Sequence, residues 1–284
     1  MARKRSRVRL LLDTSAVVHQ LHGHTLQRAA VRGAVASAEV LVPVFVRMEY
    51  MRGVILNLVE MWCLIRESVT VEDAFLDWSQ KIRQERKLKV ILMTVPHWLG
   101  GHDDWQSKHL TLRRLGELIL RMIRDLDEAY PLPQYDSMEC VLGRLDISPQ
   151  SYDDDLLLDF YQRFTAVQEG VPACRLCEFR KAQSQRLRRA EIDLASPEVR
   201  LRFVSNPGFV RQSEQTEKAA HTKAHVPSCH WCERLGDTII ALLVERGVKI
   251  VTSDHTFIPL GELLGRTVVL IPSLAELKRL EHDS

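Results

Sequence analysis

Short runs of apolar residues, three of them followed within a few positions by an acidic residue, constrain the fold of this 284-residue chain most. The first run extends from Val8 to Leu12, has the length of a buried strand, and leads directly into Asp13. Comparable runs lie at 40–46, 248–251 and 267–271. Helical patterns begin beside these runs. The order therefore predicts an α/β protein with a central parallel sheet flanked by helices.

Two acidic residues near the N-terminus are expected at one edge of this sheet. Asp13 should point from the carboxyl end of the first strand, where Thr14 and Ser15 offer hydroxyls at a helix start. Residues 40–46 are predicted to form a second buried strand, interrupted by Pro43. Glu49 then falls beyond that strand, on a helix, and can face the same edge.

Two further acidic residues near the C-terminus complete the set. Asp237 follows Gly236 and precedes apolar residues at helical spacing, so it is predicted at a helix N-terminus. Residues 248–251 predict a third strand, and Asp254 lies just beyond it, 17 residues after Asp237. That spacing fits one helix followed by one strand.

Convergence of these four carboxylates predicts a metal site. They would repel one another and raise one another's pKa values unless a divalent cation held them ionised. Oxygen ligands without histidine favour Mg²⁺ or Mn²⁺ over zinc. Such ions activate water and stabilise charge on a phosphate. The predicted reaction is phosphodiester hydrolysis with water as the nucleophile, leaving a 5′-phosphate and a 3′-hydroxyl.

Three segments resemble the motifs of PIN-domain nucleases: LLLDTSAVV at 10–18, VPVFVRMEY at 42–50 and GDTIIALLVERGVKIVTSDHTF at 236–257. The resemblance implies a PIN-like core, like that of the small toxin members, with RNA cleavage dependent on Mg²⁺ or Mn²⁺. Many small members are toxins of toxin-antitoxin pairs, which adds an antitoxin to the expected partners. The residues that it implies are the metal ligands Asp13, Glu49, Asp237 and Asp254, with Ser15 and Ser253 supporting the first and last acids.

Each acidic residue also has a simpler interpretation. A single aspartate after an apolar run is often only a helix cap. Four acids in the family's order and sequence contexts favour a shared metal site instead. The main alternative is a non-catalytic adaptor, zinc-stabilised and PIN-like, that binds nucleic acid or a protein partner.

Two CxxC pairs predict a second, structural metal site. Thiolates two residues apart can hold one tetrahedral ion, and two such pairs complete a zinc site. His221, His225 and His230 are possible substitutes for one of the zinc ligands. The alternatives to a zinc site are a disulfide framework and unrelated buried thiols. The predicted zinc ligands are Cys174, Cys177, Cys229 and Cys232.

The 188 positions between Glu49 and Asp237 predict a discontinuous core. Residues 1–57 and 233–284 are assigned to the PIN-like nuclease core, 58–130 to a helical region partly belonging to it, and 131–232 to a mostly helical insertion with the zinc site. Within the insertion, the acidic triplet at 153–155 predicts a helix start.

Charge and hydropathy indicate the expected partners and location. Net charge is only +2, but basic residues cluster at 3–9, 81–89, 113–124 and 186–189, where they could follow a phosphate backbone or form solvated helix faces. Trp98, Trp105 and Trp231 could stack on bases; core packing is the alternative for Trp98 and Trp105, whereas Trp231, inside CHWC, is expected to be exposed. RNA is the expected substrate and single-stranded DNA a possible one. The N-terminal apolar run is too short to cross a membrane, so we expect a cytoplasmic protein without membrane contact.

Overall fold

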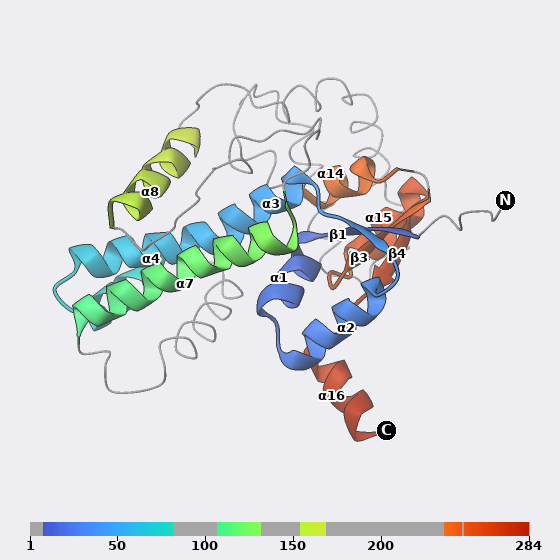
Figure 1. The fold of residues 1–284 in the computed structure, drawn as a ribbon, viewed down its shortest axis with the longest axis horizontal. Helices are drawn as coiled ribbons and strands as arrows, with labels where there is room; N and C mark the ends of the chain where they lie inside the picture. The colour runs from blue at the N-terminus through green and yellow to red at the C-terminus, as the bar shows by residue number, and fades with distance from the viewer. Residues whose placement is uncertain (1–7, 82–106, 132–153, 169–235, 246, 284) are drawn as a thin grey trace. The chain divides into compact units, whose positions relative to one another are not determined.

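The computed structural model describes residues 8–81, 107–131, 154–168, 236–245 and 247–283 (Figure 1). These residues belong to two compact units. In the described part, the first unit holds residues 8–50 with those from 236 onward, and the second holds 51–81, 107–131 and 154–168. The predicted domain boundaries at 57, 130 and 232 stay predictions.

The first unit is built on a four-stranded parallel sheet with the order β2-β1-β3-β4. Its strands are β1 (Arg9–Leu12), β2 (Glu39–Leu41), β3 (Val248–Thr252) and β4 (Thr267–Leu270). The two central strands carry the most deeply buried residues, and Leu12, Ile250 and Val251 have no exposed surface. The α/β class and the parallel sheet with flanking helices are therefore confirmed.

Six helices accompany this sheet in the described part of the first unit. They are α1 (Thr14–His22), α2 (Thr25–Val35), α3 (Val44–Tyr50), α14 (Gly236–Leu243), α15 (Phe257–Leu264) and α16 (Leu274–His282). Helix α1 contacts α2 and α3, while α14 contacts α3 and α15. Gly265 ends α15 in the left-handed region at φ 63°, a conformation that a residue with a Cβ rarely adopts. Helix α3 is thus in contact with both α1 and α14.

The predicted strand over 40–46 is wrong beyond Leu41. Strand β2 ends there, and α3 begins at Val44. Pro43 has no N–H for a strand ladder, but its carbonyl accepts the Arg47 N–H at 3.2 Å in the first helical turn. The β-branched residues that favoured a strand are fully buried in the helix instead, because tertiary packing overrides their weak local preference.

The second unit is helical in its described part. Its elements are the π-helical turn η1 (Met51–Ile55) and helices α4 (Leu56–Glu67), α5 (Val71–Lys81), α7 (Lys108–Ala129) and α8 (Asp154–Gln168). Helix α4 contacts α5, α7 and α8. Buried Trp62 of α4 donates from Nε1 to the Leu112 carbonyl of α7 at 3.1 Å. Among the helices described, none is both long enough and apolar enough to cross a bilayer.

The predicted helix at 153–155 begins at Asp154, within the segment assigned to the insertion. Asp154 and Asp155 lie in the first turn of α8, where the helix dipole favours negative charge. Since α8 contacts α4, it packs with the helical unit. The first acid of the triplet, at position 153, lies outside the described residues.

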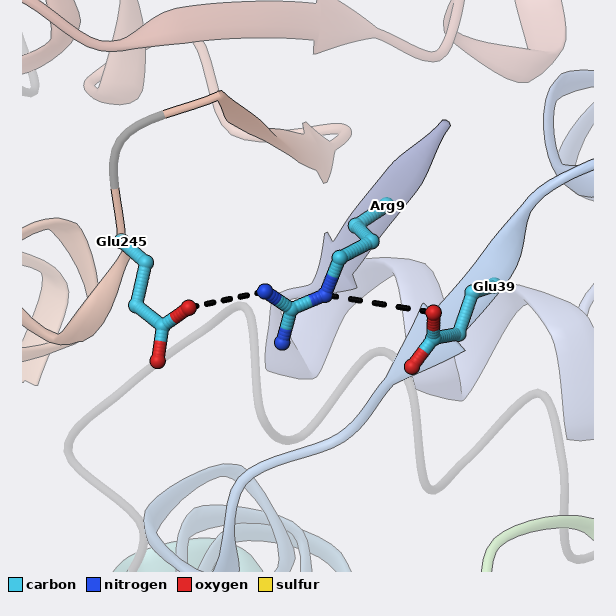
Figure 2. A network of polar contacts seen from close by, with 3 residues as sticks. All are labelled: Arg9, Glu39 and Glu245. Atoms are coloured by element: carbon cyan, nitrogen blue, oxygen red, sulfur yellow. Dashed lines mark hydrogen bonds and ion pairs between the residues drawn. The ribbon is translucent and has the colours of Figure 1, made fainter. Parts of the chain in front are cut away.

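Arg9 links three segments at the amino edge of the sheet (Figure 2). Its guanidinium donates from Nη1 to Glu245 Oε2 at 2.8 Å, and its Nε lies 3.9 Å from Glu39 Oε2. All three side chains are exposed, so solvent screens these ion pairs and they add little stability. This edge is opposite to the one that the acidic residues follow.

Candidate active site

The carboxyl ends of β1 and β3 form a topological switch point. From β1 the chain goes to β2 on one side, whereas from β3 it goes to β4 on the other. Ligands in open α/β sheets bind outside the carboxyl ends of the strands at such a point. Asp13 follows β1 and Asp254 lies two residues after β3, so both acids occupy this position.

Asp13 is a helix cap and also a buried charge. It is the N-cap of α1, and its Oδ1 accepts the Ala16 N–H at 2.8 Å. Its other oxygen, Oδ2, accepts the hydroxyl of Thr252 at 2.8 Å, and Ser15 Oγ lies 2.9 and 3.0 Å from the two oxygens. These donors favour the charged form, but burial outweighs them and raises the pKa of Asp13 to about 6.

A chain of hydroxyls joins α1 to the end of β3. Ser15 Oγ accepts from the Ser253 N–H and from the Ser253 hydroxyl, both at 2.9 Å. Ser253 Oγ also lies 2.9 Å from His19 Nε2. Ser15 thus contacts the first acid as expected, whereas Ser253 contacts Ser15 and His19 rather than Asp254.

Thr252 takes the place expected for Ser253 beside the last acid. Its Oγ1 accepts the Asp254 N–H at 2.8 Å while its hydroxyl donates to Asp13. One buried hydroxyl therefore joins the two acids. The Asp254 carboxylate also accepts the Thr256 N–H at 2.8 Å, which holds it at the turn after β3.

Glu49 approaches both α1 and α14. It is half-buried on α3, whose other residues are all buried. Its Oε2 accepts the hydroxyl of Thr14, at the start of α1. Its Oε1 lies so close to Gly236 that a Cβ on that glycine would come within 2.1 Å of it. A Cβ at the start of α14 would therefore displace the Glu49 carboxylate.

Asp237 lies in the first turn of α14, and the negative charges of all three other acids act on it. Its pKa is raised well above the usual range, first by desolvation and then by the charges of Glu49, Asp254 and Asp13, in that order. The four predicted ligands therefore come from four separate segments, and the charges of the other three act on Asp237. Repulsion of this kind is relieved by a cation.

The chemistry of the donor set fits a hard divalent ion. All four groups are carboxylates, which Mg²⁺ and Mn²⁺ prefer. Among the described residues, no three His, Cys, Asp or Glu side chains lie close enough together to hold an ion. Asp13 and Glu49 accept hydrogen bonds from the hydroxyls of Thr14, Ser15 and Thr252.

Several predicted groups lie outside the described residues. They are the four zinc ligands Cys174, Cys177, Cys229 and Cys232, the substitutes His221, His225 and His230, the tryptophans Trp98, Trp105 and Trp231, and the basic residues at 3–7, 83–89 and 186–189. In the described part, α7 carries the cluster at 113–124, where Arg113 donates to Glu117 at 3.0 Å. Both interpretations of that cluster remain open.

Sequence reasoning missed the roles of His19 and Thr252. Thr252 directly precedes Ser253, so a search for any hydroxyl beside the last acid would have included it. His19 follows Ser15 by four positions, which puts both on one face of a helix.

Comparisons of the chain with protein-family models, with curated proteins and with solved structures gave no match.

Proposed function

We propose that this protein is a metal-dependent endonuclease of PIN type that hydrolyses phosphodiester bonds. The observation that carries the proposal is the position of Asp13 and Asp254 at the carboxyl ends of the two central strands, with Glu49 close to the start of α14, which holds Asp237 in its first turn. Burial and the charges of the other three acids raise the pKa of Asp237, and a cation at the site would relieve this repulsion.

Asp13, Glu49, Asp237 and Asp254 would hold Mg²⁺ or Mn²⁺. When bound, such an ion lowers the pKa of water and stabilises negative charge on a phosphate. The protein orients the acids: Thr252 and Ser15 hold the Asp13 carboxylate, and Thr14 holds Glu49. The Thr252 hydroxyl donates to the Asp13 carboxylate and accepts the Asp254 N–H, so it links the ends of β1 and β3.

RNA is the proposed substrate, through the resemblance to PIN-domain ribonucleases. A carboxylate cluster needs no 2′-hydroxyl, so single-stranded DNA is compatible with the same chemistry. A toxin kept inactive by an antitoxin, and an RNA-processing factor, are both forms of this proposal. Each requires the same four acids.

The test is a cleavage assay with matched variants. Purified protein and its Asp237→Asn and Asp254→Asn forms are incubated with end-labelled single-stranded RNA and DNA in Mn²⁺, Mg²⁺ or EDTA. We expect cleavage only by the unaltered protein and only with a divalent ion, giving 5′-phosphate products. Circular dichroism of each variant shows whether folding is retained.

Absence of cleavage by folded protein in every condition would contradict the proposal. If the protein then still bound RNA with equal affinity in the unaltered and Asp254→Asn forms, the non-catalytic adaptor would be the better description. Cleavage that persists in EDTA would instead remove the metal from the mechanism.

Zinc binding by Cys174, Cys177, Cys229 and Cys232 stays part of the proposal. Cys232 precedes Asp237 by five positions, so a zinc ion there would restrain the segment that leads into α14. We expect one zinc per chain by elemental analysis, and its loss in Cys174→Ser. A disulfide framework predicts no zinc and a loss of free thiols on oxidation.

A further inference from the structure

The residue that ends the hydroxyl chain is a histidine from the last part of α1. His19 Nε2 lies 2.9 Å from Ser253 Oγ, and Ser253 Oγ lies 2.9 Å from Ser15 Oγ. Ser15 in turn contacts both oxygens of Asp13. His19 therefore reaches the buried acid only through two serines and has no direct contact with it.

Counting the protons along this series of hydrogen bonds shows which group donates and which accepts in each bond. An ionised carboxylate accepts only, so Ser15 must donate its proton to Asp13. Ser15 Oγ is then free to accept, and it receives the hydroxyl proton and the N–H of Ser253. With its proton so used, Ser253 Oγ can only accept from His19, whose Nε2 must carry a hydrogen.

Burial agrees with a neutral His19 ring. Desolvation lowers the pKa of His19 and outweighs a hydrogen bond with Gln27 that acts in the opposite direction. A neutral ring has one N–H, so the hydrogen at Nε2 defines the tautomer. Every donor in the chain then points toward Asp13, which strengthens the successive hydrogen bonds.

We propose that His19 is a positioning residue of the acidic site, which fixes Asp13 and the end of β3 through Ser253 and Ser15. The inference rests on the proposed function, because it assigns His19 a role in preparing the carboxylates for a divalent ion. Outer groups of this kind set the orientation of metal ligands, and their removal typically weakens metal binding about 10–100-fold.

Mn²⁺ titration followed by electron paramagnetic resonance tests the proposal on the full-length protein. The variants are His19→Ala, which removes the donor, and His19→Gln, whose amide nitrogen can donate to Ser253. His24→Ala is the matched control, since His24 is an exposed histidine that caps α2 and takes no part in the chain. We expect at least about 10-fold weaker Mn²⁺ binding in His19→Ala, recovery in His19→Gln, and no change in His24→Ala.

Nitrogen-15 spectra of the metal-free protein supply a second readout, in which His19 should show the Nε2–H tautomer. The proposal is overturned if the unaltered protein binds Mn²⁺ and His19→Ala binds it within about twofold, or if the tautomer is Nδ1–H. It is also overturned if His24→Ala weakens binding as much as His19→Ala. An unaltered protein that binds no Mn²⁺ refutes the proposed function itself, and this outcome is read from the first titration alone.

Discussion

Folding stability without divalent cations should decrease as the pH rises through the range in which Asp13 ionises. Asp13 is 3% exposed, and burial raises the pKa of its carboxyl from 3.8 to about 6. The folded state therefore holds this proton more tightly than the unfolded chain does. The contribution of the Asp13 proton to the free energy of unfolding is complete below pH 3.8 and is lost as the pH rises through about 6. A shift of about two pH units corresponds to about 3 kcal/mol.

Urea unfolding between pH 3.5 and 7.5 in EDTA measures this effect, with Asp13→Asn as the reference. Asparagine does not titrate, so the difference in unfolding free energy between the two proteins isolates the Asp13 contribution. We expect that difference to change by about 3 kcal/mol between roughly pH 4 and 7, in favour of the variant at the higher pH. Asp237 titrates in both proteins, and the Asp13 charge is the smallest of the causes that raise its pKa, so most of the Asp237 contribution cancels in the difference.

On the proposed function, Mn²⁺ should reverse the loss of stability at high pH, because it would bind the ionised carboxylates. At 100 times its dissociation constant, a ligand of the folded state adds about 2.7 kcal/mol. A free-energy difference that stays constant from pH 4 to 7 in EDTA would refute the buried-charge reasoning. A difference that changes as expected but does not respond to Mn²⁺ or Mg²⁺ would refute the metal site alone.

Three other substitutions have definite expectations. In Gly236→Ala, the new Cβ would come within 2.1 Å of Glu49 Oε1, so the carboxylate must move. Mn²⁺ binding, measured by calorimetry, should weaken at least about 10-fold. In the control Gly33→Ala, the new Cβ would have nothing within 4 Å, and Mn²⁺ binding should stay unchanged. Thr252→Val removes the hydroxyl that donates to Asp13 and accepts the Asp254 N–H, and should lower the free energy of unfolding in urea by about 1–3 kcal/mol, which Thr252→Ser should largely restore. Trp62→Phe keeps an aromatic ring but loses the hydrogen bond from Trp62 Nε1 to the Leu112 carbonyl. We expect the free energy of unfolding to fall by about 1 kcal/mol. An unchanged urea denaturation midpoint would contradict this.

The strands and the helix starts of the first unit were largely predictable from the sequence. Short apolar runs bounded by Asp13 or Gly247 have few alternatives, and β1, β3 and β4 lie where these runs predict them. Residues 44–46 were not predictable in this way. Their local preference favours a strand, and only burial on neighbouring elements makes them a helix.

The ligand candidates of the site could be predicted, but their supporting hydrogen bonds could not. The acids stand at element boundaries, and that position can be read from sequence patterns. The bonds of Thr252 and His19 join residues 239 and 234 positions apart. No local pattern specifies which hydroxyl at the end of β3 turns toward Asp13, because the choice depends on the register of β1 against β3.

That register has a consequence for biosynthesis. Strand β1 lies inside the sheet, but its partner β3 is encoded 239 residues later, with Arg9 opposite Val248. At about 5–20 residues per second, the ribosome needs roughly 12–48 seconds to supply that partner. During this delay the nascent chain has an apolar strand, Arg9–Leu12, with an open edge that other chains can pair with. The four acidic residues also cannot come together in this interval, because Asp254 is made after β3.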